Sequence, residues 1–314
     1  MLYLTMRRVD AIASTLDTLA PPEKFTVRND YAFKKVFGTE KNKDILIKFV
    51  SLVTGMQECT FADVRLENTE LTTRFYDEKT GRLDIKIKLH SGEKINLEMQ
   101  NIWFEYFTKR SIFYWTQLFL EDFSKGADYS ELKKCIAINI LNQPFHLANK
   151  IHSVYKILET EEHSELDGML EIHFLDLTKI EKEQRSELEK WLLFIQTDEK
   201  EVRKMLAKEN PLMQKAEDTM EEFYTVAEQR ALYQAAWRYE SDRVSMINES
   251  MRKGIAQGFL QGRSEGMQAG IAQGFSDGAR QTKLETAKVL KQLGDSVQKI
   301  MQATGLSADE IEKL

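Results

Sequence analysis

Two short segments of alternating side chains, joined by a turn, limit this chain to folds that contain a β-hairpin. Residues 82–89 alternate polar and apolar side chains, and residues 94–100 do the same. A period of two is typical of a strand with one buried face. We place the turn at Ser91-Gly92-Glu93, and the two apolar faces must then coincide. The pattern therefore predicts an antiparallel pair of strands whose second face is polar and charged.

The polar face of this hairpin carries two carboxylates. We predict that Asp84 opposes Gln100 and that Lys86 opposes Glu98. Asp84 and Glu98 are then diagonal neighbours, with α-carbons about 7–8 Å apart. Two carboxylates at that spacing can share one Mg²⁺, which prefers hard oxygen ligands, and the backbone carbonyl of Met99 can add a further ligand. The alternative is an ordinary solvated face on which Lys86 and Glu98 form a cross-strand ion pair.

Helical and strand-like segments alternate through the first two thirds of the chain. Helical periodicity covers residues 29–54, with a break near Gly38, and returns at about 104–123. Further strand-like segments are expected at about 61–70, 134–141 and 171–178. No strand pattern follows residue 198. We therefore expect an α/β fold with a mixed central sheet flanked by helices, followed by an all-helical C-terminal extension.

Glycine recurs at every fourth position from Gly254 to Gly278. Each glycine inside a helix costs about 1 kcal/mol relative to alanine, so this run needs compensation. Close contact with another helix is one source, because glycine lets two backbones approach. We predict a homo-oligomer formed through this glycine-ladder helix (residues 254–280), and a frayed spacer is the alternative. The other expected segments are 1–24, an N-terminal extension; 25–200, the α/β domain; 201–253, a helical region; and 281–314, a short helical tail.

Composition excludes several classes of protein. The net charge of −6 excludes a general basic coat, so nucleic acid could bind only through a local patch. Cys59 and Cys135 lie in different expected elements and lack CxxC spacing, which excludes a disulfide scaffold and a cysteine zinc motif. No uncharged apolar run of 18 residues occurs, so we expect no membrane span and a cytoplasmic protein.

Several short motifs occur in a characteristic order along nearly the whole chain. They are Asn29-Asp30-Tyr31-Ala32-Phe33-Lys34-Lys35-Val36-Phe37-Gly38, Leu83-Asp84-Ile85, Asn96-Leu97-Glu98-Met99-Gln100, Arg110 with Tyr114, and Gly126-Ala127-Asp128-Tyr129. This ordered set resembles the Rpn family of recombination-promoting nucleases, also described as transposases, within the PD-(D/E)xK nuclease superfamily. The resemblance implies a restriction-endonuclease-like core over residues 25–200. It also implies a metal-dependent DNA endonuclease that uses Mg²⁺ or Mn²⁺ and promotes recombination.

The resemblance assigns a role to each residue of the hairpin motif. Asp84 and Glu98 take the metal-ligand positions, and Gln100 takes the position that is Lys in the superfamily's name. Glutamine can orient a group through neutral hydrogen bonds but supplies no charge. Lys86 is therefore a candidate source of the missing charge, with a solvated strand lysine as the alternative. The glutamine and the acidic net charge also leave open a catalytically inactive DNA-binding or assembly protein that keeps the nuclease fold.

Candidates outside the hairpin have weaker sequence signals. Asp30 either caps the first helix, as Asp often does, or adds a third carboxylate beside the metal. Residues that could contact DNA share a cationic or aromatic side chain on an expected exposed element: Lys34, Lys35, Arg110, Tyr114 and Tyr129. The alternative for the lysines is plain solvation, and for Arg110 it is packing or an ion pair with Glu121 or Asp122.

Overall fold

A computed structural model describes residues 24–61, 63–67, 84–102, 105–180 and 185–314. The expected N-terminal extension therefore lies, except for Lys24, outside the described residues. The chain divides into two compact units, the first ending at Ser241 and the second running from Asp242 to Leu314. Each unit is described by itself.

The first unit is built on a mixed six-stranded sheet. The strands are β1 (Arg65–Glu67), β2 (Ile85–Lys88), β3 (Lys94–Gln100), β4 (Cys135–Leu141), β5 (His152–Tyr155) and β6 (Leu170–Asp176). Their order is β1-β2-β3-β4-β6-β5, with β3–β4 and β4–β6 parallel and the other neighbours antiparallel. This confirms the predicted mixed sheet. The sequence does not predict β5, because an edge strand of four residues, half of them exposed, is too short to show a period.

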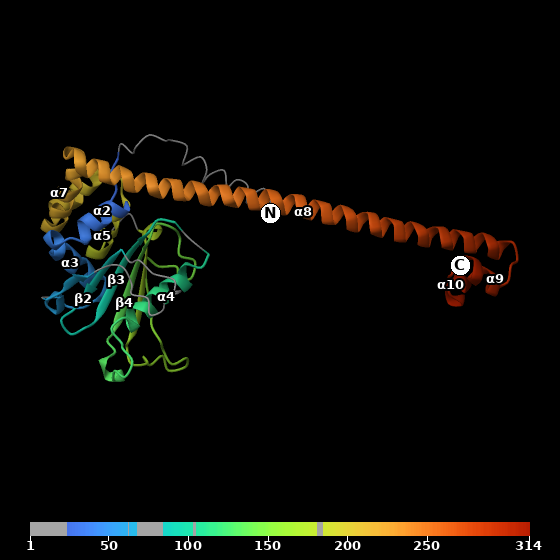
Figure 1. Cartoon of the computed structure of the whole chain (residues 1–314), viewed down its shortest axis with the longest axis horizontal. Coiled ribbons are helices and arrows are strands. Elements are labelled where there is room, and N and C mark those ends of the chain that lie inside the picture. The colour runs from blue at the N-terminus through green and yellow to red at the C-terminus, as the bar shows by residue number, and fades with distance from the viewer. Residues whose placement is uncertain (1–23, 62, 68–83, 103–104, 181–184) are drawn as a thin grey trace. The chain divides into compact units, whose positions relative to one another are not determined.

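Helices cover both faces of this sheet (Figure 1). They are α2 (Asp30–Phe37), α3 (Lys43–Thr54), α4 (Phe107–Leu120), α5 (Glu187–Gln196), α6 (Lys200–Glu209) and α7 (Pro211–Thr225). The main apolar core lies between one face and α2, α3, α5 and α7, and Trp191 packs there against the rings of Phe37 and Phe49. The face that carries Asn139 is covered by α4, whose Ser111 hydroxyl contacts the Asn139 side chain. Asp84, Glu98 and Gln100 lie on this second, α4-covered face.

The first helix ends where a glycine is sterically required. Asn29 caps α2 by accepting hydrogen bonds from the backbone N–H groups of Tyr31 and Ala32. The helix ends at Gly38, as the sequence predicts. A Cβ atom at Gly38 would lie 2.9 Å from the carbonyl oxygen of Lys34 and 3.2 Å from Cγ1 of Ile85. Glycine therefore lets the end of α2 approach β2 closely.

The hairpin forms as predicted, but the predicted register is wrong by two residues. Ile85 pairs with Leu97, whereas the predicted register sets Ile85 opposite Met99. The reason is the turn, which is centred on Ser91 and not on Gly92. Gly92 has a φ of 100° there, a conformation that favours glycine. A shift of two residues leaves every side chain on its predicted face, because side chains alternate with a period of two.

The corrected register changes which polar side chains face each other. Lys86 is opposite Asn96, so the prediction that it opposes Glu98 is wrong. The prediction that Asp84 opposes Gln100 is wrong for the same reason. Continued by one residue beyond the end of β2, the observed register sets Asp84 directly opposite Glu98. The two carboxylates are thus closer neighbours than the diagonal arrangement that the sequence predicts.

The second unit is entirely helical, which confirms the predicted helical extension. Helix α8 (Ala227–Gln292) begins in the first unit and continues through all seven ladder glycines. Two short helices follow, α9 (Val297–Thr304) and α10 (Ala308–Glu312), after turns at Gly294 and Gly305. Their apolar side chains pack on the end of α8 in a small cluster of Ala287, Ile300, Leu306 and Ile311. Among the described residues, no helix is long and apolar enough to cross a membrane.

Candidate active site

Asp84 and Glu98 converge on the α4-covered face of the sheet. Asp84 precedes β2, and its Oδ2 accepts a hydrogen bond of 2.9 Å from the backbone N–H of Met99. Glu98 lies in β3 and is only 6% exposed. Its Oε1 accepts a hydrogen bond of 3.1 Å from Nδ2 of Asn96. The structure therefore brings together the two acidic residues that the sequence analysis selected.

Burial and nearby negative charge raise the pKa of both carboxylates. Burial and the negative charge of Asp84 together raise the pKa of Glu98 to about 7, against the opposing effects of Arg110, Asn96 and Lys34. Burial also raises the pKa of Asp84, against the opposing effects of the Lys34 ammonium and the Met99 N–H. The fully ionised pair is therefore unfavourable without additional positive charge. A divalent cation is one source of such charge.

Lys34 reaches the carboxylates from helix α2. Its Nζ lies 2.7 Å from Oδ1 of Asp30 and 3.4 Å from Oδ1 of Asp84. Burial lowers the pKa of Lys34, but the neighbouring charges of Asp84 and Asp30 outweigh burial and raise it overall. The ammonium lies between the two acidic residues. Asp30 is thus connected to Asp84 through Lys34, and the capping alternative for Asp30 is wrong because Asn29 is the cap.

Arg110 reaches the same carboxylates from helix α4. Its Nη2 lies 4.0 Å from Oε2 of Glu98 and donates a hydrogen bond to Oε1 of Gln100. The Gln100 amide donates in turn to the carbonyl oxygen of Ile102. Gln100 therefore holds the guanidinium beside Glu98. The sequence predicts Arg110 as a DNA contact, with packing or an ion pair to Glu121 or Asp122 as the alternative. Its contact with Glu98 depends on the packing of α4 on β3, which cannot be deduced from local spacing.

Lys86 lies on the same face but pairs elsewhere. Its Nζ is 2.6 Å from Oε2 of Glu121 and 3.2 Å from Oε2 of Glu67, and the residue is only 5% exposed. These contacts attach the end of α4 and strand β1 to the hairpin. They favour a structural role for Lys86 over a catalytic one.

Two further candidates lie away from the carboxylate pair. Lys35 pairs with Glu222 of α7, with 3.3 Å between Nζ and Oε2. Tyr129 is 79% exposed and stacks on Phe123, beyond the C-terminal end of α4. That end of α4 adjoins the start of β3, since Asp122 pairs with Lys94 at 3.1 Å. Glu98 and Gln100 lie at the other end of β3.

The donor atoms of this site fit a magnesium ion. Asp84 and Glu98 supply hard carboxylate oxygens. The N–H and C=O of one strand residue point to the same neighbouring strand, so the Met99 carbonyl lies on the side of β3 from which its N–H contacts Asp84. No group of three or more His, Cys, Asp or Glu side chains that could hold a metal occurs in the described part of the chain. Two carboxylates with one carbonyl leave the remaining positions to water, as magnesium commonly does.

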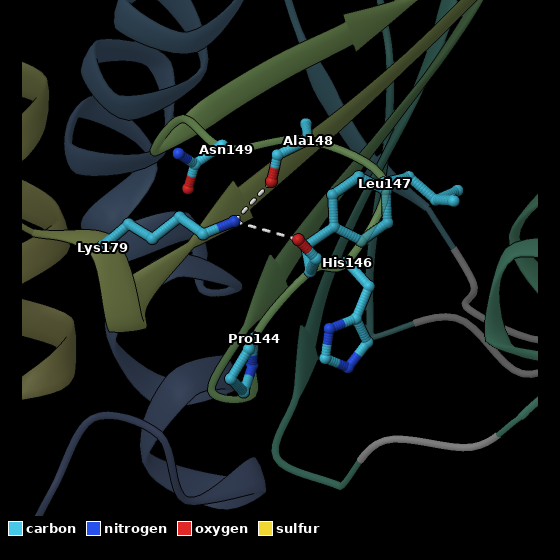
Figure 2. Close-up of a pocket in the computed structure, with 7 residues that line it drawn as sticks. Pro144, His146, Leu147, Ala148, Asn149 and Lys179 are labelled. Atoms are coloured by element: carbon cyan, nitrogen blue, oxygen red, sulfur yellow. Dashed lines mark hydrogen bonds between the residues drawn. The ribbon is translucent and has the colours of Figure 1, made fainter.

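A small hollow of about 220 Å³ adjoins these groups. Its lining includes Lys34, Asp84, Lys86 and Glu67. A second hollow of about 470 Å³ lies along the loop from Pro144 to Asn149. There the Lys179 ammonium points at the loop backbone and donates to the carbonyl oxygens of Phe145, at 2.9 Å, and Ala148 (Figure 2). Since Asp176 also pairs with Lys179 at 3.0 Å, this lysine holds the loop.

Comparison with known families gives a match over most of the chain. Residues 27–250 match the family described as PD-(D/E)XK nuclease family transposase. Comparison with curated proteins gave no match, and comparison with solved structures gave none. The matched range includes every residue of the carboxylate pair and its two cations.

Proposed function

Since this chain belongs to the PD-(D/E)XK nuclease family transposases, we propose that it is a metal-dependent endonuclease that hydrolyses phosphodiester bonds in DNA during recombination or transposition-like events. One observation carries the proposal. Asp84 and Glu98 meet on one buried face of the sheet, where burial and mutual repulsion raise the pKa of Glu98 to about 7. A structural role alone does not account for a buried carboxylate, Glu98, whose charge the neighbouring Asp84 disfavours.

Asp84, Glu98 and the Met99 carbonyl would hold the metal, which we propose to be Mg²⁺ or Mn²⁺. Bound there, the ion would neutralise charge on the scissile phosphate and lower the pKa of an attacking water. The chain's own contribution is to hold the ligands. The Met99 N–H orients Asp84, and the Asn96 amide orients Glu98. Both carboxylates are thus positioned before any substrate arrives.

Lys34 and Arg110 would supply the positive charge that Gln100 lacks. Lys34 lines the hollow beside Asp84, so its ammonium can contact a phosphate oxygen of DNA placed there. Gln100 acts as a positioning residue, because it holds Arg110 beside Glu98. A divalent ion at the carboxylates would weaken the attraction of Lys34 to Asp84 and leave the ammonium available to phosphate.

A nicking assay on supercoiled plasmid DNA tests this proposal. We expect wild-type protein to nick DNA in Mg²⁺ or Mn²⁺ and not in EDTA. Asp84→Asn and Glu98→Gln should both abolish nicking. The matched control is Glu58→Gln, an exposed carboxylate paired with Lys48. Equal nicking by wild type and Asp84→Asn would remove Asp84 from the mechanism.

Thermal melting separates the endonuclease from the alternative of an inactive DNA-binding or assembly protein. Metal that binds only the folded state raises its melting temperature. We expect Mn²⁺ to raise the melting temperature of wild type and to have little effect on Asp84→Asn. DNA binding without either nicking or a metal-linked rise would favour the inactive alternative.

We also propose that the glycine-ladder helix pairs with a second copy of this chain. A Cβ atom built at any of the seven ladder glycines would meet nothing within 4 Å. The residue after most of these glycines is apolar and exposed, as with Ile255, Phe259, Met267, Ile271 and Phe275. Phe259→Glu with Phe275→Glu should lower the mass measured by light scattering. Met246→Glu, on an exposed residue of the same helix outside the ladder, is the control, and an unchanged mass in the double variant would contradict pairing.

A further inference from the structure

Helix α4 exposes aromatic rings and cations next to the carboxylate pair. Tyr106, at the start of the helix, is 60% exposed, and Phe113 is 39% exposed. Lys109 is exposed between them, with Nζ 5.2 Å from the centre of the Tyr106 ring. Positions 106, 109 and 113 lie on one helical face, because they are three and four residues apart. We call Tyr106, Lys109 and Phe113 the α4 aromatic surface.

This surface continues without a break to the candidate active site. Tyr114 lies 6.0 Å from Phe113, ring centre to ring centre, and the Arg110 guanidinium lies 5.7 Å from the Tyr114 ring. Arg110 contacts Glu98 and Gln100 as described above. A ligand lying on the α4 aromatic surface would therefore extend to the carboxylates.

Packing against the described residues of the first unit does not explain the exposed rings on this helix. The buried side of α4 carries Phe107, Ser111 and Leu118. Tyr106 and Phe113 lie away from that side. Aromatic rings interleaved with cations are the usual platform for single-stranded nucleic acid, since bases stack on the rings and the cations meet phosphates. A duplex cannot use such a platform, because its base faces are already stacked on each other.

We infer that the α4 aromatic surface binds a DNA strand with unpaired bases and leads it to Asp84 and Glu98. Bases stack on Tyr106 and Phe113, and Lys109 contacts the phosphates between them. The inference rests on the proposed function and names its substrate class as single-stranded DNA. The net charge of −6 makes a local surface of this kind necessary for any DNA contact.

Binding in EDTA, where no cleavage occurs, tests the inference directly. The probes are fluorescein-labelled oligothymidylate and a duplex of the same length, read by fluorescence anisotropy with the full chain. We expect Tyr106→Ala and Phe113→Ala each to weaken binding of the single strand by about fivefold or more, with little effect on the duplex. Tyr239→Ala is the control, because Tyr239 is also exposed but lies on α8.

Salt dependence separates stacking from charge. Lys109→Gln should reduce the slope of log affinity against log salt by roughly 0.7, the value for one phosphate contact on a single strand. Phe113→Ala should lower the affinity with an unchanged slope. Phe113→Leu keeps an apolar side chain without an aromatic face, so it should lose as much affinity as Phe113→Ala. Full affinity in Phe113→Leu would overturn stacking.

The remaining outcomes distinguish this inference from the proposed function. Equal losses for single strand and duplex overturn the inference. A change in mass of Phe113→Ala by light scattering also overturns it, because the surface would then be a contact between protein chains. Metal-dependent nicking without preference for single strands overturns the inference alone. Preferential single-strand binding without any metal-dependent cleavage supports the inference and overturns the proposed endonuclease.

Discussion

The Lys34 ammonium lies 3.4 Å from Asp84, although the two residues belong to elements far apart in the sequence. Gly38 makes this possible, because it lets the end of α2 approach β2. The result is a cation at the carboxylate pair of a chain that has glutamine at the motif's last position. The sequence suggests Lys86 of the hairpin as the source of this positive charge, whereas in the fold it is Lys34 of helix α2 that lies beside Asp84.

Replacing Lys34 should slow cleavage without unfolding the protein. We expect Lys34→Gln to lower kcat by roughly a hundredfold, a typical effect of removing one preorganised charge from a reacting centre. Lys35→Gln is the matched control, because Lys35 pairs with Glu222 instead. Single-turnover cleavage at saturating metal is the measurement. An equal loss of kcat in both variants would show that the effect comes from general electrostatic attraction of DNA and not from a charge at the reacting centre.

The pKa of Glu98, about 7 in the folded chain, predicts that the metal-free protein becomes less stable to unfolding as pH rises. This pKa is raised above its unfolded value near 4.5. The contribution of Glu98 to the free energy of unfolding is therefore fully present below about pH 4.5 and is lost as pH rises through 7. A shift of that size corresponds to roughly 3 kcal/mol. Glu98→Gln should therefore be more stable than wild type at pH 8 and similar at low pH. Urea unfolding in EDTA at both pH values checks this, and a constant difference would contradict it.

A buried ion pair joins helices α6 and α7. Arg203 Nε lies 2.8 Å from Oε2 of Glu217, and both residues are at least 98% buried. Arg203→Met leaves the Glu217 carboxylate buried without its partner, so we expect a loss of about 3–5 kcal/mol in the free energy of unfolding. Lys190→Met, in the exposed pair with Glu209, should lose at most about 1 kcal/mol. Similar losses from the two variants would contradict the argument from burial.

Two histidines and a glutamate form a chain between strands β5 and β6. His152 Nε2 lies 2.8 Å from His173 Nδ1, and His173 Nε2 lies 2.8 Å from Oε1 of Glu171. Burial and the neighbouring His173 and Lys150 together lower the pKa of His152 to about 4. Neutral His152 is therefore the form that the fold favours.

Acidification should destabilise the chain through His152. The folded pKa of His152 is below the unfolded value of 6.5. The contribution of this residue to the free energy of unfolding is therefore present above about pH 6.5 and is lost as pH falls toward 4. We expect a loss of roughly 2 kcal/mol, after allowing for partial exposure of the ring. The measurement is urea unfolding of Glu98→Gln protein at pH 7 and pH 5, because the Glu98 carboxyl titrates in the same window and must be removed first. Adding His152→Asn to this variant should remove the remaining dependence on pH. An unchanged dependence in that variant would assign it to other groups.

Local patterns were sufficient to predict much of this protein. The alternation in residues 94–100 predicts β3 at its observed bounds, and the mixed sheet and helical extension follow from the order of such patterns. Asp84 and Glu98 lie on one face as predicted, even though the register is wrong by two residues. The face of a strand residue depends only on its parity along the chain, and a shift of two preserves parity.

Packing between distant elements decided the rest. The turn centred on Ser91 sets Asp84 opposite Glu98, the approach of α2 brings Lys34 to Asp84, and the packing of α4 brings Arg110 to Glu98. The same packing places the Lys86 ammonium beside Glu121 and away from the carboxylate pair. Periodicity along the chain determines which way a side chain points. Which charges it then meets depends on non-local contacts, and these exist only in the folded chain.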